Sequence, residues 1–454
     1  MLMPLKAAYY TGPPTQNHRP RTVVIEPKRI PRSEHSISRS QFTSATLKVL
    51  YTLRDAGFEA YVVGGGVRDL LAGLKPKDFD VATNAHPEEI RKLFRSCRLV
   101  GRRFVIAHVR YGEEIIEVTT FRGPITDMHE RDETGRILSD NAYGTLETDA
   151  FRRDFTVNAL YYDIRDFGIV DFAGGMDDMK ARTLRLIGDP ELRYREDPVR
   201  MLRAIRIGNK LHFQLDGGAV EPIKRLTALL REIPPARLFD EVLKLLLCHD
   251  AVENFRALHW LGLWGELFPE VEGEMHRNHD GTRRFIETTL ANTEDRLKQG
   301  LSVSPSYTFA ALLWPAVKAR MEALMTTQGH VQPVALTQAS EEIVGRQILR
   351  VAIPKRFSIP AKEIWALQPR FDMRRGGRPK RLMAHPVFRA AYDFLLLRAK
   401  TGEPVQELAD WWTAAQKGEA PEVPEGEQMP DAPRKRRRRR RRGGTRGNSA
   451  PPPA

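Results

Sequence analysis

The sequence predicts an α+β protein in which a small mixed β-sheet unit precedes a long all-helical region, with unstructured segments at both ends. Strand-like runs rich in β-branched residues lie between residues 60 and 121. Amphipathic helical patterns dominate after Phe172 and continue to about Trp412. Both ends lack apolar periodicity, and a chain of 454 residues is long enough for about three structural units.

The elements of the N-terminal unit can be taken in order. A helix is predicted to begin near Ser44 and to end at Gly57, where a glycine interrupts the apolar periodicity. Then follow an apolar strand at 60–63, a turn of three glycines, a helix over 67–74 and a strand at 79–82. Residues 105–111 and 115–121 alternate as paired strands do and are predicted to form a hairpin, whereas the polar residues 125–148 are expected to form a mobile loop.

The rest of the chain is expected to be helical, with helices at 198–211, 219–230 and 236–247 among others. These patterns divide the chain into five segments. They are an unstructured basic arm (1–35), the mixed-sheet head (36–170), a helical neck (171–232), a helical body (233–415) and an unstructured Arg-rich tail (416–454).

The net charge of +14 is concentrated at the two ends of the chain. Residues 434–454 contain ten Lys or Arg and no acid, and residues 1–40 carry +5, which leaves −1 for residues 41–433. A nearly neutral body with cationic arms suits a polyanionic partner such as nucleic acid, although a basic tail can also serve solubility alone. The sequence lacks an apolar run of membrane-spanning length, and its two cysteines cannot form a disulfide framework, so we expect a cytoplasmic protein.

The segment Asp78-Phe79-Asp80 carries the first chemical signal. In a strand, residues two apart project from the same face, so both carboxylates would point one way while Phe79 and Val81 enter the core. Two adjacent carboxylates repel unless cations neutralise them. A pair of divalent metal ions would do so, and such a pair can hold the attacking and leaving oxygens of a phosphoryl displacement. An isolated pair of this kind is more often simply exposed on an edge strand.

A glycine turn favours the metal-binding interpretation of the two carboxylates over an exposed pair on an edge strand. Gly64, Gly65 and Gly66 end a strand and open a helix, where bare backbone N–H groups favour a phosphate. Arg68 could pair with phosphate oxygens. Together with the paired acids, this turn indicates a nucleoside triphosphate. A third acid often completes such a site, and Glu117 and Asp154 are both candidates from the sequence.

Four ordered motifs make the head recognisable: Gly64-Gly65-Gly66-Val67-Arg68-Asp69, Asp78-Phe79-Asp80, Arg152-Arg153-Asp154-Phe155-Thr156-Val157-Asn158-Ala159 and Glu196-Asp197-Pro198-Val199-Arg200. The chain resembles the class II template-independent nucleotidyltransferases, which include the bacterial poly(A) polymerases and the CCA-adding tRNA nucleotidyltransferases. The resemblance covers residues 36 to about 415, and the termini match only in character.

The resemblance implies roles for matching residues. Asp78 and Asp80 would hold two catalytic Mg²⁺ ions, and Asp154, ranked above Glu117, would be the third functional acid. Arg153 and Asn158 would contact the nucleotide, with Asn158 in the part that recognises the ribose. Asp197 and Arg200, three residues apart on one predicted helix face, would read the incoming base, unless they only pair with each other.

Segments 99–109, 233–239, 352–356 and 385–393 look like those of poly(A) polymerases. The resemblance therefore implies a polymerase that adds AMP from ATP to RNA 3′ ends in RNA processing and decay, releasing pyrophosphate. The alternatives are CCA addition to tRNA and a catalytically silent RNA-binding protein. The dipeptides His249-Asp250 and His279-Asp280 suggest a metal phosphohydrolase site only weakly, since further ligands are missing.

Basic residues in the helical body are predicted to bind RNA phosphates, or else to form a solvated face. They are Lys355, Arg356, Arg374, Arg375, Arg378, Lys380 and Arg381. The Arg-rich tail could contact RNA, or an acidic or RNA-decay protein partner.

Overall fold

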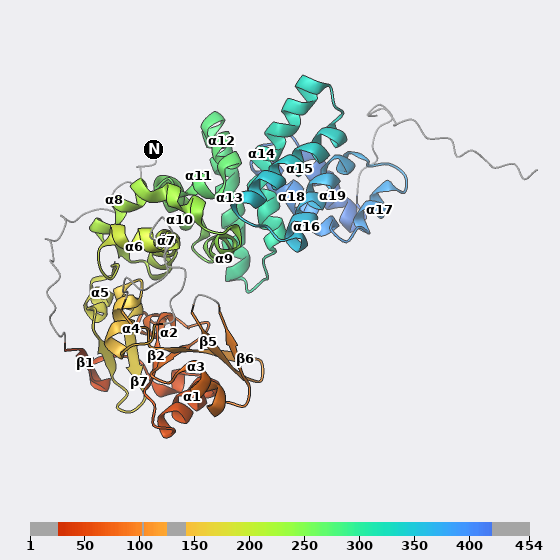
Figure 1. The fold of residues 1–454 in the computed structure, drawn as a ribbon. Coiled ribbons are helices and arrows are strands. Elements are labelled where there is room, and N and C mark those ends of the chain that lie inside the picture. Colours follow the sequence, from red (N-terminus) through yellow and green to blue (C-terminus); the bar gives the residue numbers. More distant parts are fainter. Residues whose placement is uncertain (1–25, 102–103, 125–141, 420–454) are drawn as a thin grey trace, which may run out of the picture.

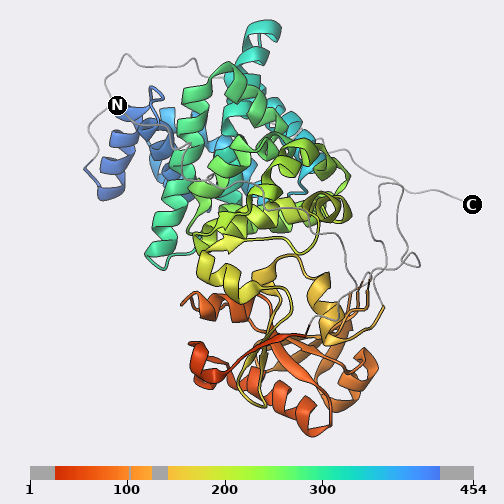
Figure 2. The same cartoon turned by 90° about the vertical axis from the view of Figure 1, so that its left-hand side faces the viewer.

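A computed structural model describes residues 26–101, 104–124 and 142–419. It consists of a mixed β-sheet unit at one end of the molecule and a stack of helices at the other (Figure 1). The view turned by 90° shows the same arrangement, with the sheet unit at one end and the helices at the other (Figure 2). The α+β class predicted from the sequence is confirmed.

The sheet has eight strands in the order β1-β8-β7-β2-β3-β6-β5-β4. The pairing of β3 with β6 is parallel and every other pairing in this sheet is antiparallel. The strands are β1 (Lys28–Ile30), β2 (Ala60–Val63), β3 (Asp80–Thr83), β4 (Cys97–Val100), β5 (Ile106–Tyr111), β6 (Glu114–Thr120), β7 (Leu160–Asp163) and β8 (Ile169–Asp171).

Alternation along the central strands gives the sheet two apolar faces. Val62 and Val81 belong to a core shared with α1 (Ser44–Asp55), α2 (Gly65–Leu71) and α3 (Pro87–Leu93). Tyr61 and Ala82 point the other way, into a smaller core with α4 (Leu146–Arg152). The sheet is therefore covered on both sides, and polar side chains reach solvent where its strands begin or end.

Several boundaries differ from the sequence expectation. The basic arm is not unstructured up to residue 35, because β1 pairs with β8; residues 1–25 lie outside the described part. The predicted loop 125–148 ends earlier, because Thr145 caps α4 through the backbone N–H of Thr148; residues 125–141 also lie outside the described part. Strands β4, β7 and β8 were not predicted; β7 and β8 are buried on both faces and so show no polar alternation.

The sheet unit leads through α5 (Gly175–Ala181) into the helical region. A short parallel pair, β9 (Thr183–Leu184) and β10 (Gln214–Leu215), lies at this junction. The helices that follow are α6 (Pro190–Glu196), α7 (Val199–Leu211), α8 (Gly217–Leu226), α9 (Pro235–Leu246), α10 (Ala251–Trp260), α11 (Leu263–Leu267), α12 (Pro269–Arg277), α13 (His279–Lys298), α14 (Pro305–Gln328), α15 (Gln332–Arg350), α16 (Lys355–Leu367), α17 (Arg378–Met383), α18 (Phe388–Lys400) and α19 (Gln406–Lys417).

One large apolar core joins most of these helices, with Trp264 and Trp365 fully buried in it. A separate cluster around Phe371 and Trp412 closes the end of the stack. Helices α7 and α9 match the predicted ranges to within one residue at each end. None of the helices in residues 26–419 that the structure describes is long and apolar enough to cross a membrane.

Candidate active site

The carboxylate pair lies where β3 begins. Asp80 is the first residue of β3, and Asp78 precedes the strand. Phe79 and Val81 are buried, whereas Asp80 is half-buried and Asp78 is exposed. Asp78 and Asp80 therefore lie away from the core that takes up Phe79 and Val81, as the sequence predicted.

The glycine turn directly adjoins Asp80. Strand β2 pairs antiparallel with β3 so that Val63 opposes Asp80, and Gly64 follows at the strand end. Gly64 has φ +77°, a conformation that disfavours any residue with a Cβ. A Cβ at this position would lie 3.7 Å from Asp80 Oδ2 and 3.6 Å from Arg153 Nη1. The backbone of the turn, a carboxylate and a guanidinium therefore meet at one point.

Asp80 sits in an unusually acidic environment. Burial is the main factor that raises its pKa to about 6, and the negative charges of Glu117 and Asp78 add to the rise. Glu117 is the register partner of Asp80 on the parallel strand β6. A cation bound beside these carboxylates would offset their mutual repulsion and favour their ionised forms.

The donor set suits magnesium better than a metal held by protein alone. Within the described ranges, no group of three or more His, Cys, Asp or Glu side chains could hold a metal ion. Mg²⁺ commonly binds one or two carboxylates and completes its shell with waters and substrate phosphates. The oxygen pair of Asp78 and Asp80 fits that mode, and neither His-Asp dipeptide forms part of a larger ligand group.

Asp154 and Glu117 occupy different places. Asp154 is buried, which alone would raise its pKa, but the Arg203 guanidinium and the Asn158 amide outweigh burial and hold its pKa well below the ordinary value. Arg203 lies 2.7 Å from Asp154 Oδ2, and Asn158 Nδ2 donates to Oδ1 at 2.9 Å. Glu117 is thus the acid whose charge acts on Asp80, while Asp154 is held by α7.

Arg68 is buried beneath the turn and not extended into solvent. It donates to Asp69 Oδ1 at 2.6 Å and to Asn158 Oδ1 at 2.7 Å. Asn158 therefore bridges Arg68 and Asp154, and this chain of hydrogen bonds ties the glycine turn to α7. The phosphate role expected for Arg68 stays a prediction.

Arg153 is held beside Gly64 by a buried acid. Asp149 accepts from Arg153 Nη2 at 2.8 Å and from the Tyr161 hydroxyl at 2.6 Å. Burial alone would raise the pKa of Asp149, but Arg153 and Arg122 outweigh burial and lower it. Asp149 therefore fixes the orientation of Arg153 toward the carboxylates.

A pocket of about 410 Å³ lies between the sheet unit and helices α7 and α9. It brings together Asp154, which was predicted to be a catalytic acid, and three of the predicted nucleotide-binding residues, Arg153, Asp197 and Arg200. It also contains residues that sequence reasoning missed, among them Arg122, Arg203 and Arg237. Arg203 follows Arg200 by three positions on α7, a spacing that could have pointed to it.

Asp197 does not share a helix face with Arg200, contrary to the sequence expectation. It has extended backbone and ends α6, whereas Arg200 lies in the first turn of α7. Asp197 accepts from Arg237 at 2.6 Å, and Arg200 donates to Glu196 at 3.0 Å. The break between α6 and α7 is what places both side chains at the pocket.

The predicted RNA-binding residues fall on two elements. Lys355 and Arg356 are exposed at the start of α16. Arg374 and Arg375 are half-buried before α17, and three exposed residues of α17, hereafter the α17 basic group, are Arg378, Lys380 and Arg381. Figure 1 shows α17 far from the sheet, so this group cannot touch the carboxylates. The Arg-rich run 434–442 lies outside the described residues.

Comparison with known proteins first places the sheet unit among nucleotidyl-transferring enzymes, because the family described as "Poly A polymerase head domain" matches residues 60–185. "Probable RNA and SrmB- binding site of polymerase A" matches residues 212–275, and "Polymerase A arginine-rich C-terminus" matches residues 328–443. All three matches describe the same kind of protein.

The particular family follows from full-length similarity. The chain is 46% identical to a poly(A) polymerase I of Salmonella typhi over 402 residues, which cover 87% of this chain and 86% of the relative. A CCA-adding enzyme of Lactobacillus helveticus is 41% identical over 201 residues, or 44% of this chain and 49% of that protein. The Bacillus stearothermophilus CCA-adding enzyme, crystallised with CTP, is 26% identical with a TM-score of 0.52 and covers 84% of this chain and 83% of its own. The chain belongs to the poly(A) polymerase I family.

Proposed function

We propose that this protein adds AMP from ATP to RNA 3′ ends without a template. The observation that carries the proposal is the meeting of Asp80, the Gly64 turn and Arg153, since Arg153 also lines the pocket that contains Asp154, Asp197 and Arg200. Similarity to poly(A) polymerase I over 87% of the chain supports the choice of AMP, since the CCA-adding relative matches less than half of it.

In the proposed reaction the RNA 3′ oxygen forms a bond to the α-phosphorus of ATP, the bond to the β-phosphate oxygen breaks, and pyrophosphate leaves. Asp78 and Asp80 would hold two Mg²⁺ ions, which would supply charge neutralisation and a lower pKa for the attacking hydroxyl. The backbone N–H groups of the glycine turn bind phosphate oxygens. Arg153, fixed by Asp149, adds a cation beside them.

The base would be read at the break between α6 and α7. Asp197 offers a carboxylate to the exocyclic amine of adenine, and Arg200 offers donors to ring nitrogens. Arg237 holds Asp197 in place at 2.6 Å. In this proposal the head (36–170) carries the chemistry, the neck (171–232) reads the base, and the body (233–415) binds RNA.

RNA would be held by Lys355, Arg356 and the basic residues near α17, and the Arg-rich tail would add affinity or bind an acidic or RNA-decay protein. A cytoplasmic location is part of the same proposal, and cell fractionation tests it.

Primer extension tests the chemistry. Asp78→Ala and Asp80→Ala should each abolish AMP addition to a short RNA with ATP and Mg²⁺, while the melting temperature stays within a few degrees of the parent. Asp280→Ala, which removes an equally charged but exposed residue, should leave extension intact. A folded Asp78→Ala/Asp80→Ala protein that still extends RNA would falsify the assignment.

The nucleotide composition of the product separates the CCA alternative. With all four triphosphates in competition, a generic RNA should acquire a tract of A. Rejection of that RNA, together with ordered addition of C, C and A to a tRNA lacking its end, would refute poly(A) addition.

A further inference from the structure

We propose that a second pocket, on the side of α2 away from the glycine turn, binds a phosphate monoester joined to an apolar group and weakens ATP binding when it is filled. This pocket has a volume of about 480 Å³, within the range of small-molecule sites. It lies between the C-terminal end of α2 and the junction of α5 and α7 with β9 and β10, and it shares no lining residue with the pocket beside Asp154.

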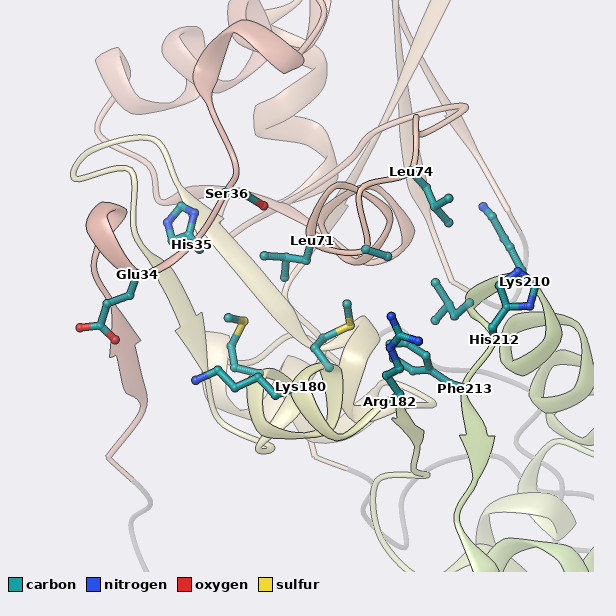
Figure 3. Close-up of a pocket in the computed structure, with 14 residues that line it drawn as sticks. Glu34, His35, Ser36, Leu71, Leu74, Lys180, Arg182, Lys210, His212 and Phe213 are labelled. Carbon is teal, nitrogen blue, oxygen red and sulfur yellow. The ribbon is translucent and has the colours of Figure 1, made fainter. Parts of the chain in front are cut away.

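The chemistry of the walls defines the ligand class. Lys180, Arg182, Lys210 and His212 surround the pocket, and Glu34 is the one carboxylate among its lining residues. Figure 3 shows Leu71 of α2 facing Lys180 and Arg182 across the space, with Lys210 and His212 at its other end. A phosphate monoester carries a charge near −2 at neutral pH and pairs well with Arg and Lys, so it matches Lys180, Arg182 and Lys210.

The floor of the pocket is apolar. Leu71, Met176, Met179 and Phe213 contribute to it, and the Phe213 ring remains partly accessible. A flat or alkyl group can pack there, and the flexible methionines can adapt to its shape. Inorganic phosphate alone would leave this surface uncovered.

The backbone is strained at two residues that line the pocket, Arg182 and His212. Arg182 and His212 have φ angles of +52° and +53°, and each ends a helix, α5 and α7 respectively. Glycine is the usual residue at such positions because a Cβ is unfavourable there. The two residues precede β9 and β10, and the backbone N–H of Gln214 donates to Arg182 O at 2.9 Å, which locks the two strained turns together. Two strained backbone positions whose side chains line one cavity are consistent with a ligand site.

Lys210 links this pocket to the active site. Its ammonium lies 2.6 Å from Asp69 Oδ2, and Asp69 Oδ1 accepts from Arg68. Arg68 donates to Asn158, which donates to Asp154 in the nucleotide pocket. A phosphate that attracts Lys210 competes with Asp69 for it, and the loss of this restraint loosens Arg68 and Asn158. The coupling rests on the proposed function, whereas the binding does not.

Calorimetric titration of the full chain with 1-naphthyl phosphate tests the binding. We expect saturable binding of 1-naphthyl phosphate, with an affinity that falls at least tenfold in Lys180→Ala/Arg182→Ala. Inorganic phosphate should bind to the parent at least tenfold more weakly than 1-naphthyl phosphate does. Lys180→Ala/Arg182→Gly, which keeps a glycine-compatible turn, should lose binding equally. Lys92→Ala/Arg98→Ala, which removes two exposed charges from the sheet unit, is the matched control and should bind as the parent does. Equal binding by the parent and both pocket variants would overturn the proposal, and equal affinity for inorganic phosphate would overturn the ligand class.

Competition with AMP identifies the source of the phosphate. Only the part of the 1-naphthyl phosphate binding that is lost in the two pocket variants is counted. Displacement of 1-naphthyl phosphate supports a nucleotide, and retention supports a non-nucleotide phosphate. In primer extension, 1-naphthyl phosphate should raise the KM for ATP about three- to tenfold in the parent but not in Lys180→Ala/Arg182→Ala. If the pocket binds 1-naphthyl phosphate but the KM for ATP does not change, the coupling is overturned while the binding site stands. Failure of the chain to extend RNA at all would instead count against the proposed function.

Discussion

Gly66 offers a way to disturb the carboxylates without touching them. It lies in the first turn of α2, and an added Cβ would lie 2.7 Å from Phe79 Cδ1 and 3.3 Å from Asp78 O. Ordinary contact begins near 3.4 Å, so the ring must move by about 0.7 Å. Phe79 is buried against Phe42, with ring centroids 5.1 Å apart, and cannot swing aside freely. The displacement must pass into the backbone that carries Asp78 and Asp80.

Gly66→Ala should therefore reduce activity far more than stability. Overpacking of this kind costs about 1–3 kcal/mol of the free energy of unfolding. A displacement of about 1 Å in a reacting group can cost about 100-fold in rate, so kcat/KM for AMP addition should fall by about that factor. Primer extension gives kcat/KM, and urea unfolding gives the stability.

Two further variants test whether contact through Phe79 positions the carboxylates. Gly66→Ala/Phe79→Leu removes the clashing ring and should recover at least tenfold of the lost activity. Gly345→Ala, in the open middle of α15, meets no atom within 4 Å and should stabilise the protein by about 0.5–1 kcal/mol without changing activity. If Gly66→Ala keeps full activity, or if the double variant is no better than the single, contact through Phe79 does not position the carboxylates.

The other predictions concern charge. Asp149→Asn should cost about 3 kcal/mol in urea unfolding, because it leaves the half-buried Arg153 guanidinium without its carboxylate partner. Because the pKa of Asp149 is lowered in the folded state, its contribution to the free energy of unfolding is present above its unfolded pKa, near 4, and is lost as the pH falls below that value. The difference in free energy of unfolding between parent and variant should therefore narrow below about pH 4, and a constant difference would contradict the prediction. Replacing the α17 basic group with Ala should lower the slope of log Kd for single-stranded RNA against log salt by up to about 2, since each phosphate contact contributes about 0.7. An unchanged slope would show that α17 does not contact the RNA phosphates. Deleting residues 434–454 should weaken RNA affinity and its salt dependence while single-nucleotide addition persists, and equal affinity at low and high salt would count against the tail.

The local features of the fold could be predicted because each is encoded within a short stretch of chain. Helix α1 follows from apolar spacing and a terminal glycine, and the β5–β6 hairpin follows from alternation around Gly112. The adjacency of the glycine turn and Asp80 was also accessible, since two short strands joined by one helix commonly pair. Strands such as β7, which are buried on both faces, carry no polar alternation and escaped prediction.

Interactions between distant segments could not be read in the same way. The pairing of β1 with β8, the ion pair between Asp197 and Arg237, and the charge of Glu117 on Asp80 each join residues more than 35 positions apart. The end of α6 at Glu196 is encoded locally instead, because Pro198 disfavours helical backbone at Asp197.

The chemistry of this protein can be read from its residues alone: two carboxylates separated by one residue, a glycine bend that phosphate can approach, and cationic ends for a polyanion. The partners of those groups depend on how distant elements pack. In the tertiary structure Glu117 lies opposite Asp80 on the neighbouring strand, and Asp154 forms an ion pair with Arg203. Arg68 is buried and hydrogen-bonded to Asp69 and Asn158, and a second pocket lined by basic residues lies at the C-terminal end of α2. The reason is physical: residue type fixes what a group can bind, whereas the packing of distant elements fixes the distances and the burial on which its charge and its hydrogen bonds depend.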